Sequence, residues 1–188
     1  MIIAIEGHAG VGKTTLAKAL SKELDFEYVK FPLGELMGLN IESDYSALTN
    51  IVKYGNSFIT AWFLALNDIY ALTHYRDKNA VVDRLLLTNY LFNYSDETKD
   101  IFELSMKYSG KPDLFILLEA SKEIRIQRIK ERNPCDMNLN KETSCSAENS
   151  ALIDLLQKLD YRYDIIDVSN LNKEAVLKKA KKIIENLY

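Results

Sequence analysis

Short apolar runs alternate along the chain with segments in which hydrophobic residues recur every three or four positions. This alternation is typical of an α/β protein, because parallel strands are buried on both faces and are joined by helical crossovers. Apolar runs predict strands at Ile2–Ile5, Phe26–Phe31, Ala80–Val82, Leu114–Leu118 and Asp164–Val168. Helical spacing predicts helices over about residues 13–24, 44–54, 57–76, 97–109, 121–132, 148–161 and 172–187. The pattern therefore predicts a five-stranded parallel sheet with helices on both faces.

No repeat or linker divides the chain of 188 residues, and this length suits one domain. The stretch 133–148 is rich in Asn, Ser and Thr and has little hydrophobic periodicity. We expect this stretch to form a short lid rather than core. The sequence therefore predicts a single domain over residues 1–188 with a lid at about 133–148.

The first predicted strand leads directly into a glycine-rich segment. This segment fits G-x-x-x-x-G-K-T, with the sequence Gly7-His8-Ala9-Gly10-Val11-Gly12-Lys13-Thr14-Thr15. Glycines let backbone N–H groups surround a phosphate, and a helix that begins at Lys13 adds its positive dipole end. In this motif the lysine reaches the β and γ phosphates, and the Thr14 hydroxyl holds Mg²⁺. The segment therefore predicts a site for ATP with Mg²⁺, in which His8 has no catalytic role.

Charged residues that follow the apolar runs are further candidates, because ligands of such sheets bind beyond the carboxyl ends of the strands. Asp83 follows the run Ala80–Val82 and could hold Mg²⁺ directly or through water. Arg84 would then face the transferred phosphoryl group or its acceptor. The structural alternative is an internal Asp–Arg pair that caps the strand. We expect the catalytic role, because the topology places this strand beside the phosphate-loop strand.

Three arginines, Arg125, Arg128 and Arg132, share the helix that leads into the predicted lid. Arg128 and Arg132 are four residues apart and project from one face. On lid closure they could neutralise charge on the transferring phosphoryl group. The alternative is a solvated helix face.

Aromatic residues between Tyr54 and Tyr70 recur mostly at helical spacing, which is typical of core packing. One or two of them could nevertheless stack on a nucleobase. Phe31, at the end of the second predicted strand, is a further candidate for contact with the substrate.

Charge and hydropathy narrow the class of protein. The net charge of −3 gives no broad nucleic-acid footprint, and the apolar stretch Ala61–Leu66 is too short to span a bilayer. The first strand enters the phosphate loop at once, so no signal peptide is expected. Cys135 and Cys145 lack the spacing of a zinc site and are expected to be reduced. These features favour a cytoplasmic enzyme.

Nearly the whole chain resembles the thymidylate kinase and deoxynucleoside kinase group of P-loop kinases. The similar segments are Ile5–Thr15, Lys30-Phe31-Pro32, Val81–Arg84, Lys111–Leu114, Glu119-Ala120-Ser121, Arg128–Arg132 and Asp164–Ser169. The resemblance implies the P-loop kinase fold and transfer of the γ-phosphoryl group of ATP. It also implies that Arg128 lies near adenine, Arg132 approaches phosphate, Arg84 contacts the acceptor, and Asp83 serves Mg²⁺ or the acceptor.

The departures from this group fall on the acceptor side. Ala9 stands where thymidylate kinases carry an aspartate, and Leu33-Gly34-Glu35 where they carry a phosphate-binding arginine. Asn67-Asp68 stands where they carry an arginine that contacts the base. Deoxynucleoside kinases place a catalytic carboxylate just before the proline, and this chain has Phe31 there, with Glu35 one helical turn beyond.

The sequence is compatible with two kinds of phosphoryl acceptor. A sugar 5′-hydroxyl benefits from a base, whereas a phosphate acceptor is already nucleophilic and needs cations, which Lys30 and Arg84 could supply. We favour a nucleoside monophosphate, with a deoxynucleoside as the alternative. Asp68 would favour a base that presents an amino group, because a carboxylate only accepts hydrogen bonds.

A regulatory or non-catalytic P-loop protein is the alternative of another class, although the guanine-selecting N-K-x-D pattern is absent. The expected partner is a small nucleoside or nucleotide, with no nucleic acid and no membrane. By analogy with related kinases, the apolar helix Phe58–Leu72 could support a homodimer.

Overall fold

The computed structural model describes residues 1–39, 50, 55–136, 139 and 149–187. Its sheet has five parallel strands in the order β2-β3-β1-β4-β5. The strands are β1 (Ile2–Gly7), β2 (Glu27–Val29), β3 (Ala80–Asp83), β4 (Leu114–Glu119) and β5 (Tyr163–Asp167). The sequence prediction of a five-stranded parallel sheet is confirmed.

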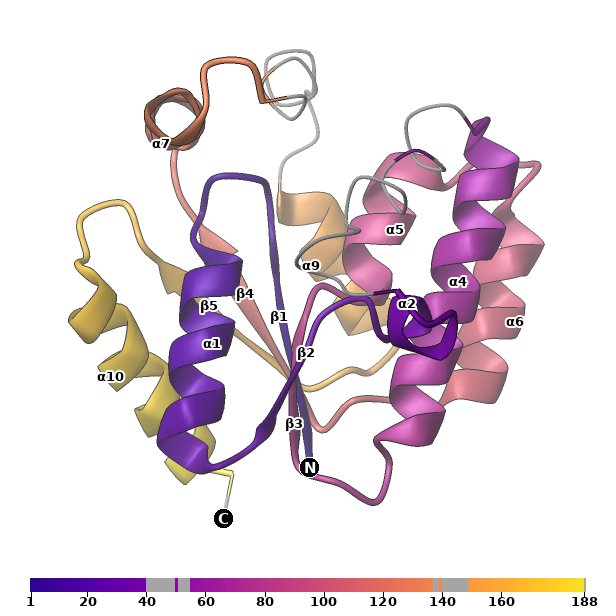
Figure 1. The fold of residues 1–188 in the computed structure, drawn as a ribbon, viewed down its shortest axis with the longest axis horizontal. Helices are drawn as coiled ribbons and strands as arrows, with labels where there is room; N and C mark the ends of the chain where they lie inside the picture. The colour runs from indigo at the N-terminus through magenta and orange to yellow at the C-terminus, as the bar shows by residue number, and fades with distance from the viewer. Residues whose placement is uncertain (40–49, 51–54, 137–138, 140–148, 188) are drawn as a thin grey trace.

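Helices cover both faces of this sheet (Figure 1). On one face lie α1 (Lys13–Leu24) and α10 (Lys173–Glu185). The other face carries α4 (Ser57–His74), α5 (Leu86–Asn93), α6 (Lys99–Ser109) and α9 (Asn149–Lys158). The short helix α2 (Pro32–Leu36) lies beside α4, and α7 (Lys122–Arg132) lies beyond the carboxyl end of β4.

Side-chain alternation along β1 divides the core into two layers. Ile3 and Ile5 pack toward α1 and α10, whereas Ile2 and Ala4 pack toward α4 and its neighbours. All six residues of β1 are buried, as expected for the central strand of a sheet that is covered on both faces. The phosphate-loop segment that follows β1 is therefore anchored to the most buried part of the fold.

The connection after β2 corrects one prediction. The strand ends at Val29 rather than at Phe31, because Phe31 has a left-handed backbone with φ of 53° and Pro32 has no N–H to donate to a ladder. Pro32 instead begins α2, a helix that the hydrophobic pattern did not predict. Phe31 therefore does not end the strand, although it still follows it.

A second helix, α5, was also missed. Its apolar residues Leu86, Leu87, Tyr90 and Leu91 do have helical spacing, but the helix is only 8 residues long, too short for the spacing to stand out. Its buried residues, Leu86, Leu87 and Asn89, face the sheet, α4 and α9. The helix predicted at 44–54 and most of the predicted lid lie outside the described residues. None of the helices in the described parts of the chain has the length and apolar character needed to cross a membrane.

Candidate active site

The loop between β1 and α1 requires glycine at two close approaches. Gly7 (φ 131°) pairs with Leu118 of β4, and a Cβ there would lie 2.3 Å from the Leu118 carbonyl oxygen. Gly10 (φ 83°) lies against α7, where a Cβ would be 2.6 Å from the carbonyl oxygen of Arg125. The loop is thus held between β4 and α7.

Gly12 begins α1 in a left-handed conformation and has no side chain that could cap the helix. The N–H groups of the first turn, beginning at Lys13, are therefore available to an anion beyond the helix end. The Lys13 side chain is buried, and its ammonium group donates hydrogen bonds to the carbonyl oxygens of Gly7 (2.7 Å) and His8 (2.5 Å). These contacts hold a positive charge within the loop, as phosphate binding requires.

Asp83 lies directly across from the loop. Its backbone pairs with Ile5, and its Oδ2 accepts a hydrogen bond from the Thr14 hydroxyl at 2.5 Å. Oδ2 also lies 3.1 Å from the Tyr28 hydroxyl and 3.5 Å from the Lys30 ammonium group. Oδ1 is buried and has no hydrogen-bond partner among the residues that the structure describes. The structure thus brings together Thr14 and Asp83, the two predicted metal ligands.

Arg84 adopts a left-handed backbone, with φ of 76°, immediately after Asp83. Such a conformation costs on the order of 1–3 kcal/mol for a residue other than glycine and is common at functional sites. The Arg84 N–H donates to the carbonyl oxygen of Ile5 at 3.1 Å, which fixes this turn to β1. The guanidinium-bearing side chain lines the same cleft as the phosphate loop.

Glu6 supports the Asp83-Arg84 turn through hydrogen bonds from residues that follow it. Its fully buried carboxylate accepts from the Leu85 N–H (2.8 Å), the Thr88 N–H (3.4 Å) and the Thr88 hydroxyl (2.5 Å). It therefore caps the first turn of α5, whose preceding residue, Leu85, provides no side-chain cap. Burial raises the pKa of Glu6, although these hydrogen bonds and the charge of Lys13 oppose the shift.

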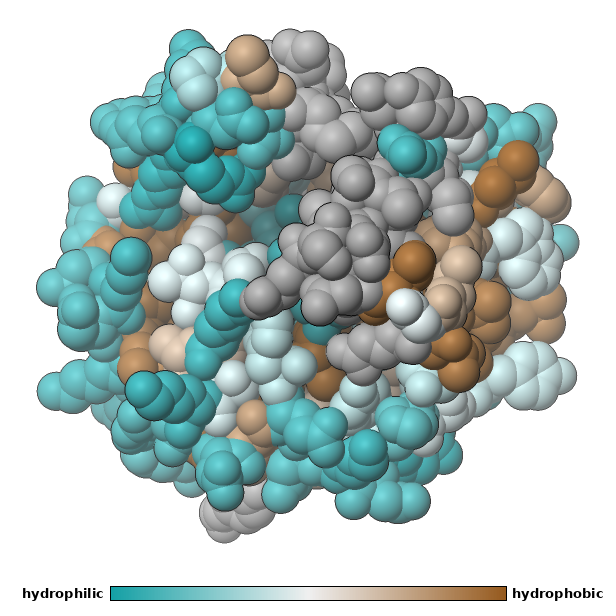
Figure 2. Space-filling view, viewed as in Figure 1, coloured by the Kyte–Doolittle hydropathy of each residue, from teal (hydrophilic) through white to brown (hydrophobic). Residues whose placement is uncertain are grey.

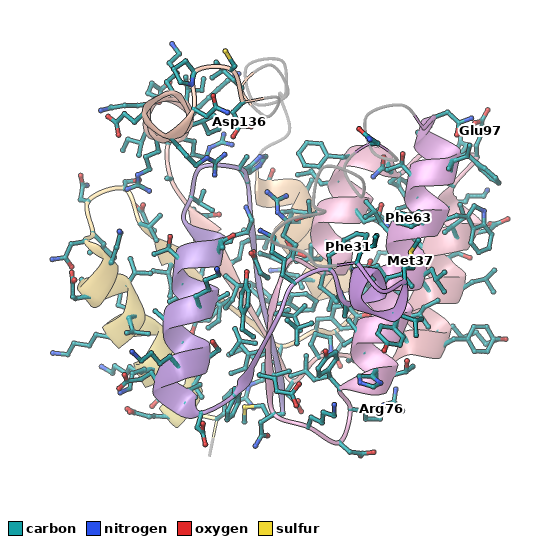
Figure 3. The ribbon with its side chains drawn as sticks, in the orientation of Figure 1. Phe31, Met37, Phe63, Arg76, Glu97 and Asp136 are labelled. Carbon is teal, nitrogen blue, oxygen red and sulfur yellow. The ribbon has the colours of Figure 1, made fainter. Side chains whose placement is uncertain are left out.

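A cleft of about 1340 Å³ opens above the loop and is lined by α7 and by the residues that follow β5. An arginine from α7, Arg128, donates to the carbonyl oxygen of Val168 at 3.0 Å, across the cleft mouth. Arg132 forms an ion pair with Asp136 beyond the end of α7 (Figure 3). Both predicted lid arginines therefore line the cleft, whereas Arg125 is buried against the loop.

Two of the predicted substrate residues, Phe31 and Asp68, lie on the α4 side of the sheet. The Phe31 ring lies 5.4 Å from that of Phe63 on α4 (Figure 3). Asp68, also on α4, is 3% exposed and lies close to the side chains of Asn67 and Asn89. Burial, reinforced by the negative charge of Glu6, raises the pKa of Asp68 well above its ordinary value. Asp68 therefore lies near Glu6, which directly precedes Gly7 of the phosphate loop.

Sequence reasoning missed Tyr28 and assigned no role to Glu6, although Glu6 ends the first apolar run. Tyr28 and Lys30 are two residues apart and approach the same carboxylate, as side chains on one face of a strand do. This spacing of two residues was the sequence signal that could have identified Tyr28. Glu6 ends β1, but nothing in the sequence indicated that it caps α5.

The family model for thymidylate kinase matches residues 5–180. A probable thymidylate kinase of Saccharolobus solfataricus is 30% identical over 195 residues, covering 100% of this chain and 98% of the relative. A Thermococcus kodakarensis protein, provisionally named an adenylate kinase, is 26% identical over 180 residues, covering 92% and 78%.

A solved structure of the deoxyadenosine kinase of M. mycoides, with products dCMP and dCDP, has a similar fold. The TM-score is 0.66 at 23% identity, and the match covers 99% of this chain and 100% of that one. The family model spans most of the chain and includes the phosphate loop and the Asp83-Arg84 turn. The chain belongs to the thymidylate kinase family and is a nucleoside or nucleotide kinase.

Proposed function

We propose that this kinase transfers the γ-phosphoryl group of ATP to a nucleoside monophosphate whose base carries an amino group. The observation that carries the proposal is the contact between the Thr14 hydroxyl and the Asp83 carboxylate, with Lys13 and Arg84 on either side. The loop would bind the triphosphate, and Lys13 and Arg84 would place positive charge beside the path of the transferred phosphoryl group. Such an arrangement works by positioning and by charge stabilisation.

The residues present fit ATP with Mg²⁺. A protein site for Mg²⁺ commonly uses one or two oxygen ligands together with substrate phosphates, so no larger cluster of acidic residues is needed. Asp83 offers the buried Oδ1 described above, and Thr14 offers a hydroxyl. When bound, Mg²⁺ would neutralise charge on the β and γ phosphates.

The remaining steps fall to the chain's own side chains. The loop amides and Lys13 bind the triphosphate, and Arg128 contacts the adenine side of ATP. Arg132, released from Asp136, approaches the transferred phosphoryl group as the lid at about 133–148 closes and excludes water. Arg84 and Lys30 hold the acceptor phosphate.

A phosphate acceptor is favoured by the charges on the acceptor side. Lys30 and Arg84 are cations near Asp83, whereas the residue before Pro32 is Phe31 and cannot act as a base. The alternative, a deoxynucleoside acceptor, is supported by the similarity in fold to deoxyadenosine kinase and by Leu33-Gly34 in place of a phosphate-binding arginine.

The preference for an amino-bearing base rests on Asp68, which occupies the place of a base-contacting arginine. Its Oδ2 has no hydrogen-bond partner within the described ranges. Two relatives agree with this preference, since adenine and cytosine both carry an amino group. One is provisionally named an adenylate kinase, and the other is the deoxyadenosine kinase solved with dATP and with dCTP. Phe31 would pack against the same substrate.

We further propose that the chain forms a single cytoplasmic domain that acts on small molecules, without nucleic acid or membrane. A homodimer through α4 is supported by the exposed side chains of Phe58, Ile59, Trp62 and Leu66. Figure 2 shows hydrophobic side chains gathered on this side of the molecule, over α2 and α4. Light scattering of the purified protein tests the dimer.

A coupled ADP-release assay tests the acceptor. AMP, dAMP, dCMP, dGMP and dTMP are compared with the matching nucleosides at equal concentration. We expect the highest kcat/KM with an amino-bearing monophosphate. Higher values with a nucleoside would establish the alternative, and a dTMP rate above every amino-bearing base would refute the role of Asp68.

A further inference from the structure

We propose that Tyr28 is a positioning residue, which holds the Asp83 carboxylate so that one oxygen is presented to the metal ion. This inference rests on the proposed role of Asp83 as a metal ligand. Tyr28 touches neither substrate in the proposed function and acts only through Asp83. No sequence motif identified it.

The two oxygens of Asp83 differ sharply in their surroundings. Three donors, Thr14, Tyr28 and Lys30, converge on Oδ2 at 2.5, 3.1 and 3.5 Å. Oδ1 is buried without a partner in the described part of the chain. Saturating one oxygen fixes the rotation of the carboxylate and leaves the other as the acceptor for a cation. An unpaired buried carboxylate oxygen is otherwise costly, so its retention points to a ligand.

Tyr28 is well placed to be a rigid donor. It sits in the middle of β2, where it pairs with Val81 of β3, two residues before Asp83. Its ring packs against the core layer on the α1 side, with the Lys18 ammonium group 5.4 Å from the ring centroid. Thr14 and Lys18 are one turn apart on α1, so the same helix face supports both the ring and the carboxylate.

The other two donors to Oδ2, Thr14 and Lys30, each have a second proposed role. The Thr14 hydroxyl is itself the second proposed metal ligand. The Lys30 side chain is 26% exposed, its contact is the longest of the three, and it is proposed to hold the acceptor phosphate. When Lys30 turns toward the acceptor, the Tyr28 hydroxyl remains on Oδ2. The orientation of Asp83 is therefore maintained through the reaction.

The test is metal binding in the absence of turnover. Mn²⁺ is titrated into protein saturated with a non-hydrolysable ATP analogue, and free Mn²⁺ is measured by EPR. We expect Tyr28→Phe to raise the Kd for Mn²⁺ about tenfold, the scale typical of groups that orient metal ligands. Tyr163→Phe is the matched control, because it removes a hydroxyl bonded to Gln157 at the far end of β5. It should leave the Kd unchanged.

A double-mutant cycle separates positioning from a general structural effect. In an Asp83→Asn background, Tyr28→Phe should produce no further loss, because Tyr28 acts through the carboxylate. An unchanged Kd in Tyr28→Phe, or an equal loss in both backgrounds, would overturn the inference while leaving the kinase proposal intact. If Asp83→Asn itself left the Kd unchanged, the metal-ligand role of Asp83 would fall, and this inference with it.

Discussion

Gly10 and Gly12 offer a sharp test of how the phosphate loop is held. Both have left-handed backbones, with φ of 83° and 100°. Alanine at either position therefore incurs a backbone cost of roughly 1–2 kcal/mol. Their surroundings differ, because a Cβ on Gly10 meets the Arg125 carbonyl at 2.6 Å and the Ile129 side chain at 3.1 Å, whereas no described atom lies within 4 Å of one on Gly12.

The steric clash at Gly10 sets how much stability the alanine variant should lose. Arg125 and Ile129 belong to α7, and the closer contact is with backbone, which cannot rotate away. Forcing an extra methyl group into such packing costs typically about 1–3 kcal/mol. We therefore expect Gly10→Ala to lower the free energy of unfolding by about 2–5 kcal/mol in total, combining both terms. Gly12→Ala should cost only the backbone part.

Urea denaturation of both variants, followed by circular dichroism, measures the difference. Gly12→Ala is the matched control, since it lies two residues away in the same loop. With an m-value of about 1–3 kcal/mol/M, the midpoints should differ by roughly 1 M. Equal midpoints for the two variants would refute the contact between loop and α7, and with it the argument that α7 is fixed over the cleft.

Three further predictions concern single side chains. Lys13→Ala should abolish phosphoryl transfer while circular dichroism remains native, because it removes the positive charge of the loop and the partners it loses are two carbonyls of that same loop; unimpaired ADP release would contradict the site. Arg132→Ala should lower kcat by a large factor, since its charge matters most in the transition state; steady-state kinetics that changed KM alone would count against it. Asp68→Asn should change the pH dependence of stability. The raised pKa of Asp68 means that the folded protein binds its proton more tightly, so stability falls as pH rises above the ordinary value of 3.8. The melting temperature of the variant relative to wild type should therefore be higher at pH 8 than at pH 4, and a difference independent of pH would disprove the shift.

The hydrophobic pattern was sufficient for the sheet and for the long helices. Short apolar runs and helical spacing are local properties, and β1 and α1 carry one each on either side of the glycine loop. The pattern failed at α2 and α5. There, Phe31 takes a left-handed backbone, and α5 is too short for its helical spacing to stand out, although it packs against the sheet, α4 and α9.

The sequence by itself determined the phosphate loop and the Asp83-Arg84 turn, and it predicted Arg128 and Arg132 as lid arginines, because each is a short pattern whose chemistry depends on nearby residues. Only the tertiary structure decided which side chains meet across the sheet. Tyr28 and Lys30 reach Asp83 through pairing of β2 with β3, and Glu6 and Asp68 approach each other from β1 and α4. These contacts join residues about 50 or more positions apart, so their distances and their shifted pKa values are set by packing and burial, which no local pattern encodes.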